Sequence, residues 1–582
     1  MSSQSSQEIN VSNIEKKILK NTLLINPNNL QEKDQSVSHL SLFSKTCKNY
    51  SSIHMQYQDS YMSKSSIFDV TMLKSMAKEV TLPLDISTFQ DNLQEIIHSS
   101  LSGTHLILPP GSLKLQSLQI KKSMHFKGSP GTNLIIDNGP IQIGSSEDDN
   151  KLLITFSELS FEFLSNFPGM SSLFSIEGSQ NYLEFSDCVI SYNLKNQSND
   201  EAICFLLNST DNEVNIYSST LTLDSCNISG FGSICKSCDS ASIILNKCHF
   251  SNSSDSALIL ISPKLLKISY SLIEKCKKNA IEILAAAENT GLSTTRTKSS
   301  TSQVSAKEII IENSDFKYNQ GSGLLIHSEN LADYNADLTI DFCKISHNKK
   351  EGICLKHIFL KSMKIINSDI SCNHLTGIWV QKVYRSSLES EFTISYNRIF
   401  DSFHGYGFYS YASCPILENN EIFRNTLGGI MIAGNCTTSI FDISKYLNII
   451  SCDIQANGEN GIYICEYYNI VMIESCKISE NNKSGLFLHM NPGKDMNDGL
   501  KMYIQAKNCQ ILENKSFGVV FVKSKCFFSN VVMVNNVNGQ IQYGEGSKGL
   551  VKFDDENDMS VQEQYVPVKV KKNSCKGICT VF

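Results

Sequence analysis

Several features that mark secreted, membrane and nucleic-acid-binding proteins are missing from this sequence of 582 residues. The opening stretch, MSSQSSQEINVSNIEKK, is polar and lacks the apolar segment of a secretory signal. No run reaches the roughly 18 apolar residues that a membrane-spanning helix requires. The net charge is −7 and no basic stripe is present, so nucleic acid is a poor candidate partner. We therefore expect an intracellular, cytoplasmic protein.

A zinc motif is also missing, although the chain contains 20 cysteines. Cys235 and Cys238 form a C-x-x-C pair, but no second pair follows at zinc spacing, so we expect no metal and no cofactor. Other cysteines share one place in a repeated pattern, two residues before an aliphatic position: Cys188, Cys226, Cys248, Cys343, Cys452, Cys476 and Cys509. Serine or asparagine takes that place in other copies, which indicates a column of small residues whose thiols stay reduced.

What the C-terminal half does contain is a short repeated frame. An aliphatic residue is followed three positions later by Asn, then four positions later by Gly, and then by an apolar–x–apolar segment. The Asn/Gly pairs are Asn319/Gly323, Asn348/Gly352, Asn373/Gly377, Asn425/Gly429, Asn457/Gly461, Asn481/Gly485, Asn514/Gly518 and Asn535/Gly539, with Asp401/Gly405 in one copy. Fixed internal spacing with variable overall length is typical of one supersecondary unit that carries loop insertions.

Short β-strands wound into coils are the structure that this frame predicts. The frame contains no helical period, and its apolar residues alternate between turn residues. Strands this short cannot bury a face alone, but each can pair with its equivalents in the coils above and below, about 4.8 Å away. Stacked Asn side chains can then bond along the axis at a corner, where Asn also tolerates left-handed backbone, and Gly permits close turns. We predict an all-β parallel solenoid.

The frame resembles the right-handed parallel β-helix repeats of the pectate-lyase-like superfamily. It is most similar to a eukaryotic intracellular group that includes F-box β-helix proteins and the SHC-binding-protein family. The resemblance extends over roughly residues 84–545 and is clearest after about residue 220. It implies a right-handed parallel β-helix, but it implies no single activity, because this fold carries lyases, hydrolases and pure binding proteins.

Three regions are expected along the chain. Residues 1–80 form a helical or partly disordered N-terminal region, residues 81–547 form the β-helix with a loop insertion at 286–306, and residues 548–582 form a charged tail. Within the second region, Thr88 can cap a helix that runs through Ile97 and covers the open end of the first coil. Within the first, a segment at 36–53 is similar to the last helix of an F-box.

Carboxylates are missing from the outward positions of the best-defined sheet. Two residues after each Gly the chain has Leu325, Cys354, Trp379, Gly407, Met431, Tyr463, Phe487 and Val520. Four residues after each Gly it has His327, Lys356, Gln381, Tyr409, Ala433, Cys465, His489 and Val522. Enzymes of this fold need paired acids, or a base with cations, so no catalytic residue is assigned. His404, in a segment similar to the Gly-His-Gly of polygalacturonases, is interpreted as a turn residue.

The leading functional hypothesis is a non-catalytic scaffold that binds a protein partner through an outer sheet face. Its predicted partner-binding residues form an apolar stripe: Leu325, Trp379, Met431, Tyr463, Phe487 and Val520. One alternative is a substrate receptor of a cullin-type ubiquitin ligase, which would dock an adaptor through residues 1–60. Another is a carbohydrate-active lyase or hydrolase, which would require three or more Asp or Glu side chains converging on one outer face.

The chain ends in Cys579-Thr580-Val581-Phe582, which fits a C-a-a-X box with Phe in the last position. Lys569, Lys571, Lys572 and Lys576 lie just upstream. We therefore predict prenylation at Cys579. Together with the lysines, it would give reversible peripheral attachment to a membrane.

Overall fold

The computed structural model describes residues 79–81, 86–137, 139–144, 151–164, 172–178, 181–192, 202–208, 219–237, 241–285, 307–386, 391–434, 446–465, 470–489, 503–522, 524–544 and 551–553. All of them belong to the second of two compact units, Met76–Phe582. The first unit, Met1–Ser75, lies outside the described residues, as do the predicted insertion at 286–306 and Cys579. Among the described residues, no helix is long and apolar enough to cross a membrane.

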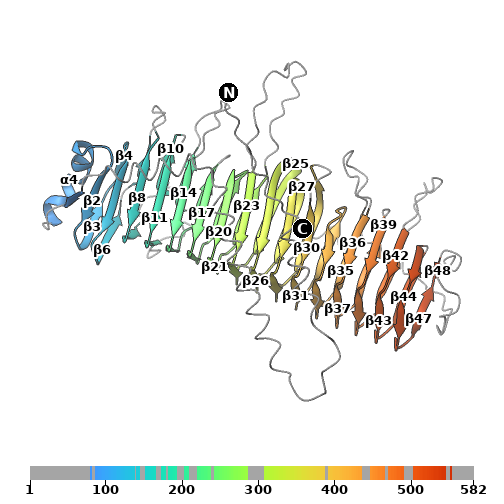
Figure 1. Ribbon diagram of the computed structural model, residues 1–582. Coiled ribbons are helices and arrows are strands. Elements are labelled where there is room, and N and C mark those ends of the chain that lie inside the picture. Colours follow the sequence, from blue (N-terminus) through green and yellow to red (C-terminus); the bar gives the residue numbers. More distant parts are fainter. Residues whose placement is uncertain are drawn as a thin grey trace, which may run out of the picture. The chain divides into compact units, whose positions relative to one another are not determined.

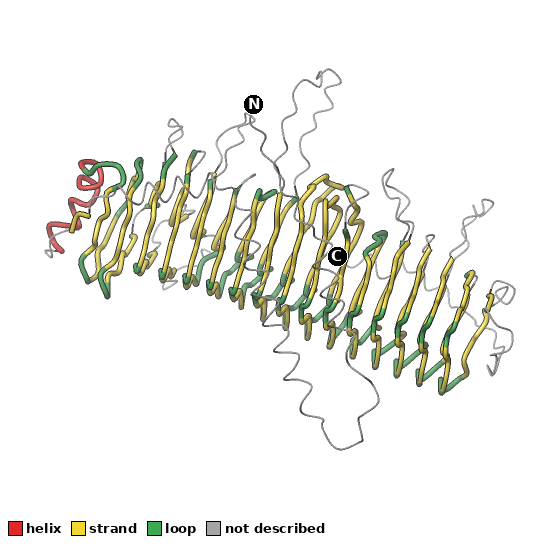
Figure 2. The backbone as a smooth tube through the Cα atoms, in the orientation of Figure 1, coloured by secondary structure: helices red, strands yellow, loops and turns green. Residues whose placement is uncertain are grey.

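The described chain is the predicted right-handed parallel β-helix, with coils that follow one another in sequence order (Figures 1 and 2). Each full coil contributes a strand to each of three faces. The first face contains β1 (Glu79–Thr81), β2 (Thr104–Leu108), β5 (Met124–Gly128), β8 (Leu153–Ser157), β11 (Tyr182–Ser186), β14 (Thr220–Asp224), β17 (Ser242–Asn246), β20 (Leu265–Ser269), β23 (Lys307–Glu312), β30 (Phe392–Ser395), β33 (Ile416–Glu418), β36 (Tyr446–Ile450), β39 (Ile470–Glu474), β42 (Tyr503–Lys507), β45 (Lys525–Ser529) and β48 (Val551–Phe553).

The second face is a separate sheet of short strands. It contains β3 (Gly111–Leu115), β6 (Thr132–Ile136), β9 (Ser160–Phe163), β12 (Val189–Tyr192), β15 (Asn227–Ser229), β18 (His249–Ser251), β21 (Leu272–Glu274), β24 (Asp315–Lys317), β26 (Lys344–Ser346), β28 (Asp369–Ser371), β31 (Arg398–Phe400), β34 (Glu421–Phe423), β37 (Asp453–Gln455), β40 (Lys477–Ser479), β43 (Gln510–Leu512) and β46 (Val532–Val534). Because side chains alternate along a strand, the residues on either side of the buried central residue of each three-residue strand point away from the core.

The third face follows the Asn/Gly corner. It contains β4 (Leu118–Ile120), β7 (Ile141–Ile143), β10 (Ser172–Glu177), β13 (Ile203–Asn208), β16 (Ser233–Ser237), β19 (Leu258–Ile261), β22 (Ile281–Leu284), β29 (Ile378–Arg385), β32 (Tyr406–Tyr411), β35 (Gly428–Ala433), β38 (Asn460–Cys465), β41 (Leu486–His489), β44 (Phe517–Val522) and β47 (Gly539–Tyr543). Two long strands, β25 (Leu324–Asp341) and β27 (Ile353–Ile366), run from the third face of one coil into the first face of the next, and so join the two faces into one sheet.

The core is built from the residues that alternate inward along these strands. The predicted inward positions of the third face are all fully buried: Ile430, Ile432, Ile462, Ile464, Leu486 and Leu488. Each stacks on its equivalent in the next coil, as Ile432 does on Ile464 and Ile464 on Leu488. The period-two pattern in the sequence therefore gave both the strands and their buried side correctly.

The Asn ladder lies at the corner between the second and third faces. Asn457 donates from Nδ2 to Asn481 Oδ1 at 3.0 Å and to Ile422 O at 3.1 Å. Its Oδ1 accepts from the backbone N and the Nδ2 of Asn425, at 3.0 and 3.1 Å. Each ladder Asn thus satisfies buried backbone groups and its neighbours at once. The left-handed residue is the one before it, such as Ala456 (φ 54), and not the Asn as predicted.

The glycines of the frame are required by close approach of adjacent coils and not by the turn itself. A Cβ placed on Gly429 would lie 2.5 Å from Gly461 O, 2.5 Å from Ile454 Cγ2 and 3.0 Å from Asn457 Nδ2. Gly429 has no left-handed backbone angle, so conformational freedom is not the reason for glycine here. The corner is packed too tightly against the ladder of the next coil to hold a side chain.

Two pairs of the predicted frame were wrong. Ser402 and Gly407, and not Asp401 and Gly405, occupy the ladder and glycine places in their coil, since Ser402 N donates to Asn425 Oδ1 at 3.1 Å. In the last coil, Asn536 accepts from Asn514 N at 3.0 Å and takes the ladder place that we assigned to Asn535. Asn535 is instead the left-handed residue, and two adjacent asparagines made the choice ambiguous in the sequence.

The cysteine column lies at the corner between the first and second faces, as predicted. All seven cysteines are buried, and all are free thiols among the described residues. Cys452 Sγ, for example, donates to Ile450 O at 3.4 Å and to Leu417 O of the preceding coil at 3.7 Å. A small side chain that donates to backbone is what this corner needs, and Ser271 and Ser314 do the same in other coils.

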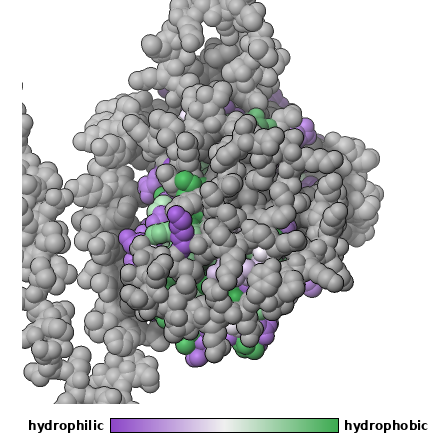
Figure 3. Space-filling model, turned by 90° about the vertical axis from the view of Figure 1, so that its right-hand side faces the viewer, coloured by the Kyte–Doolittle hydropathy of each residue, from purple (hydrophilic) through white to green (hydrophobic). Residues whose placement is uncertain are grey.

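The two ends of the solenoid differ. At the N-terminal end, helix α4 (Ile86–Ser99) starts two residues before the predicted cap Thr88 and buries Leu93 and Ile97. At the other end, β48 extends the first face beyond the predicted boundary at residue 547. The last coil of the second face exposes Val532 and Val534. Figure 3 faces this end and shows hydrophobic side chains, in green, beside hydrophilic ones on its coloured part.

Candidate functional site

Charged side chains line one outward column of the second face. The first residue of each short strand stacks on its equivalent in the next coil, which gives the series Asp315, Lys344, Asp369, Arg398, Glu421, Asp453 and Lys477. The central residue of each strand, such as Ile454, is fully buried, so its neighbours on either side are outward-facing. Four carboxylates therefore lie in one outward column, and two of them, Glu421 and Asp453, occupy adjacent coils.

Arg398 holds two of these carboxylates. Its Nη1 lies 3.6 Å from Asp369 Oδ2, and its Nε donates to Glu421 Oε2 at 3.3 Å. The guanidinium also lies over Phe400, with Cζ 5.1 Å from the ring centroid. Phe400 and Phe423 stack with centroids 4.7 Å apart and planes 4° from parallel. The stacked rings fix the guanidinium in position, because cation–π contact and two carboxylates act on it together.

A second guanidinium packs on the same ring pair. Arg424 donates to both oxygens of Asp401, each at 2.8 Å, and its Cζ lies 4.7 Å from the Phe423 centroid. The contact with Asp401 raises the pKa of Arg424. Both arginines near the carboxylate column are thus already paired with carboxylates of this chain.

Two carboxylates of the column have a raised pKa. Burial raises the pKa of Asp453; Lys477, its neighbour in the column, opposes this rise, and Glu421 and Glu480 add to it. Burial likewise raises the pKa of Asp369, and Arg398 only partly opposes it. In both, Oδ1 is buried and makes no hydrogen bond within the described part of the chain. Asp453 and Glu421 are direct neighbours across β37 and β34. Asp453 therefore holds its proton more readily than an exposed Asp does, because its pKa is raised, while its neighbour Glu421 is bound by Arg398.

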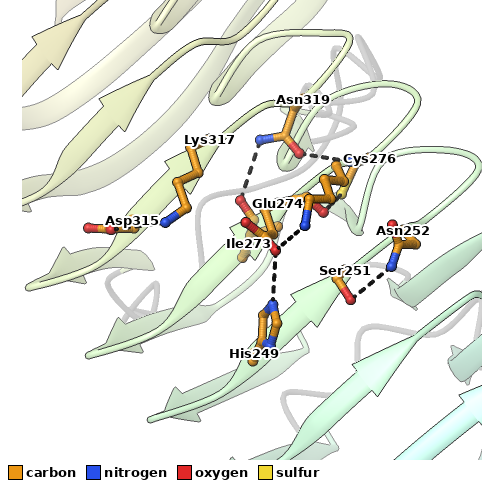
Figure 4. A network of polar contacts seen from close by, with 10 residues as sticks. His249, Ser251, Asn252, Ile273, Glu274, Cys276, Asp315, Lys317 and Asn319 are labelled. Atoms are coloured by element: carbon orange, nitrogen blue, oxygen red, sulfur yellow. Dashed lines mark hydrogen bonds and ion pairs between the residues drawn. The ribbon is translucent and has the colours of Figure 1, made fainter.

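The polar surface continues toward the N-terminal coils, as Figure 4 shows. Glu274 Oε1 lies 3.4 Å from His249 Nε2 and 2.9 Å from Lys275 Nζ, and Lys317 Nζ lies 3.8 Å from Asp315 Oδ2. Burial alone would raise the pKa of Glu274, but Lys275 and His249 outweigh it and lower the pKa. These carboxylates are ion-paired and Glu274 has a lowered pKa, whereas Asp369 and Asp453 have raised pKa values.

No group of three or more His, Cys, Asp and Glu side chains that could hold a metal ion occurs among the described residues. His404 lies at a turn, as predicted, and its side chain is exposed. Its ring contacts His374 edge-on, with centroids 4.5 Å apart.

The six residues of the predicted apolar stripe do lie in one column of the third face. Leu325, Trp379, Met431, Tyr463, Phe487 and Val520 follow one another through the strand register. Tyr409, and not Gly407, is the member between Trp379 and Met431, a consequence of the misplaced frame in that coil. Met431 and Val520 are only 3% and 2% exposed, whereas the others are half-buried.

The sequence analysis missed the acids of both faces. On the third face the column continues one coil further to Glu282, which pairs with Leu325. Glu282 escaped notice because Cys276 and Ala280 replace Asn and Gly in that coil. On the second face the signal was present: a charged residue precedes the repeat's aliphatic position in coil after coil, as in Asp453-Ile454. The sequence analysis looked for outward side chains only at positions after each Gly, and so it did not consider this column.

Comparisons with known proteins agree on the fold. A family model for the right-handed β-helix region matches residues 298–444. No curated protein matches the chain. Among solved structures, the periplasmic alginate epimerase AlgG is 10% identical with a TM-score of 0.29, over 80% of this chain and 83% of that one. The A-module of the Azotobacter vinelandii mannuronan C-5 epimerase AlgE4 is 11% identical with a TM-score of 0.25, over 79% and 94%.

The bacteriophage CBA120 tailspike protein 3 is 9% identical with a TM-score of 0.29, over 81% of this chain and 59% of the tailspike. With TM-scores below 0.5, these three likenesses carry no argument about this chain. The resemblance to the F-box β-helix and SHC-binding-protein families is not supported by these matches. The F-box alternative depends on residues 1–60, which lie outside the described residues, and it stays a prediction, as does prenylation at Cys579.

Proposed function

We propose that this protein is a carbohydrate-active hydrolase, with Asp453 on the second face as the general acid and base and Glu421 beside it as the nucleophile. The observation that carries the proposal is the adjacent pair of carboxylates with opposite surroundings. Asp453 is partly buried with a raised pKa, whereas Glu421 accepts from Arg398 at 3.3 Å. Hydrolysis of a glycosidic bond needs one carboxylic acid and one carboxylate at a defined separation.

In the proposed reaction, Asp453 protonates the glycosidic oxygen as the bond to the anomeric carbon breaks. Glu421 attacks that carbon and forms a glycosyl ester. The Asp453 carboxylate then takes a proton from a water molecule, which displaces Glu421 and restores both groups. Neighbouring strands lie about 4.8 Å apart, close to the roughly 5–5.5 Å between carboxyl groups in retaining enzymes. The pair Asp369 and Glu421 is two coils apart and lacks this spacing.

Hydrolysis fits the site better than elimination. A lyase needs cations to stabilise the carboxylate of its substrate. Arg398 is already shared by Asp369 and Glu421, and Arg424 is bound to Asp401 through both oxygens. Lys477 lies beside Asp453, which leaves Lys344 as the remaining cation of the column. The leading hypothesis from the sequence, a non-catalytic scaffold, gave no role to this face, because it rested on the absence of outward carboxylates.

The test is release of reducing ends from a panel of linear polysaccharides by the full chain, with two variants. Asp453→Asn and Glu421→Gln should each lower kcat by at least about 100-fold, because each removes a group that exchanges a proton or forms a bond with the substrate. The matched control is Asp315→Asn, which should keep wild-type activity. Asp315 lies in the same column but three coils away from Arg398, the residue that binds Glu421.

Two results would overturn the proposal. One is the absence of hydrolysis on every polysaccharide by a protein whose circular dichroism shows an intact solenoid. The other is activity that survives both substitutions, which would place the chemistry on another face.

A further inference from the structure

Asp369 shares an arginine with the proposed nucleophile, but the proposed reaction gives it no role. It lies two coils from Glu421, and Arg398 lies in the coil between them. The guanidinium faces both acids at once: Nη1 is 3.6 Å from Asp369 Oδ2, and Nε donates to Glu421 Oε2 at 3.3 Å. One planar cation therefore connects Asp369 to the nucleophile.

Two phenylalanine rings support the same guanidinium. Its Cζ lies 5.1 Å from the centroid of Phe400 and 5.7 Å from that of Phe423. The Arg398 side chain is 54% exposed, so packing alone does not select one rotamer. The rings hold the guanidinium at the sheet surface but do not decide which of its nitrogens meets Glu421. A carboxylate on the other edge of the guanidinium does decide it, because the N–H donors of arginine form a rigid fork.

Asp369 is held more firmly than the arginine that it binds. Its side chain is 36% exposed and its Oδ1 is buried, so Oδ2 is the oxygen directed at Arg398. The charged and titratable groups that face it are Lys344 in the preceding coil, Arg398 in the next, Glu421 one coil further and the Cys372 thiol. Burial raises the pKa of Asp369, Arg398 and Lys344 oppose the rise, and Glu421 adds to it. The charge on Asp369 is therefore coupled to both the arginine and the nucleophile.

We infer that Asp369 is a positioning residue of this site, which anchors the edge of Arg398 remote from Glu421 and so keeps Nε bound to Oε2 of the nucleophile. The inference rests on the proposed function, in which the other oxygen of Glu421 attacks the anomeric carbon. A carboxylate held in one orientation reacts faster than one that rotates freely. Protonation of Asp369 removes the negative charge that anchors the guanidinium, so the site loses activity in acid before the fold is affected.

The experiment compares kcat and KM of the full chain and of Asp369→Asn on a polysaccharide that the wild type hydrolyses. kcat should fall about tenfold, because the nucleophile loses its fixed orientation, while KM should stay within about twofold. Arg398→Gln should lower kcat at least as much, and adding Asp369→Asn to it should cost less than about twofold more, because the two residues act as one unit. The matched control is Asp401→Asn, which releases Arg424 on the same pair of rings and should keep wild-type kcat.

The pH profile separates positioning from a merely structural role. On the acid side, wild-type kcat should fall as both Asp369 and the nucleophile take up protons. In Asp369→Asn, the fall should involve one proton fewer and be correspondingly less steep. A variant that is only destabilised would instead lose the same fraction of activity at every pH at which it stays folded, and that result overturns the inference.

A second measurement needs no activity. The pKa of Asp369, followed through its carboxyl carbon by NMR, should rise in Arg398→Gln and fall in Glu421→Gln, since these two groups act on Asp369 with opposite sign. Wild-type kcat in Asp369→Asn overturns the inference and leaves the proposed hydrolase intact. Absence of hydrolysis on every polysaccharide overturns the proposed function, and a pKa of Asp369 that neither substitution moves overturns the inference in either case.

Discussion

Truncation of one rung of the Asn ladder is the sharpest test of what holds the coils together. Asn457 is fully buried and its side chain takes part in four hydrogen bonds. In Asn457→Ala, the backbone N and Nδ2 of Asn425 lose their acceptor, and Ile422 O loses its side-chain donor. Asn481 Oδ1 keeps the backbone N of residue 457 as a donor.

The expected loss follows from those contacts. A net contribution of about 1 kcal/mol for each of four buried hydrogen bonds gives a loss of about 4 kcal/mol in the free energy of unfolding. The assay is guanidinium denaturation followed by circular dichroism. Hydrogen exchange adds a local readout, because the amide of Asn425 should exchange faster once its acceptor is gone. Asn482→Ala is the matched control, since Asn482 is exposed and its side chain accepts from Lys515 at the surface.

The control should change stability by less than about 0.5 kcal/mol. If Asn457→Ala destabilised the protein by less than about 1 kcal/mol, or left the exchange of the Asn425 amide unchanged, the ladder would not be the structural device described here.

Three further predictions concern the core, the corner and acid. Ile464→Asp should lower the free energy of unfolding by several kcal/mol, because it buries an unpaired charge, and an unchanged melting temperature would refute this. Gly429→Ala should cost about 1–3 kcal/mol in the same assay, since its Cβ would meet Gly461 O at 2.5 Å. The pKa of Glu282 is lowered to about 2, by His327 and by hydrogen bonds from Ser256 and Asn279. Ionised Glu282 therefore stabilises the fold fully above its unfolded pKa of about 4.3, and this stabilisation is lost as the pH falls through about 2. In Glu282→Gln, the denaturation midpoint should consequently fall less steeply between about pH 4.3 and pH 2 than it does in the wild type.

Local patterns in the sequence were enough to predict the repeating part of the fold. The spacing of Ile454, Asn457 and Gly461 defined a corner and a strand, and the alternation of Ile462 and Ile464 defined the buried side. The frame was assigned wrongly in the coil at Asp401. Ser402 occupies the ladder position there, and because serine has no side-chain amide, the search for an Asn-like residue selected Asp401 and Gly405 instead. A pattern defined by residue type misplaces its positions in a coil where a different residue type makes the same contacts.

The candidate site was harder to predict than the fold, for a physical reason. Asp369, Glu421 and Asp453 are far apart in sequence and meet only because coils of different length stack in register. Their chemistry depends on burial of each carboxylate and on the position of Arg398, and neither can be read from a repeat. The outward column of the second face was nevertheless accessible to sequence reasoning, one residue before each aliphatic position.

The stereochemistry of hydrolysis tests the central claim, the assignment of Asp453 and Glu421 as the reacting pair, most directly. Proton NMR of the first product released from an active polysaccharide identifies its anomeric configuration before mutarotation. Adjacent coils, about 4.8 Å apart, predict that the configuration of the substrate is retained. A product of inverted configuration would contradict the assignment, because inversion requires a wider separation that leaves room for water, such as that of carboxylates two coils apart.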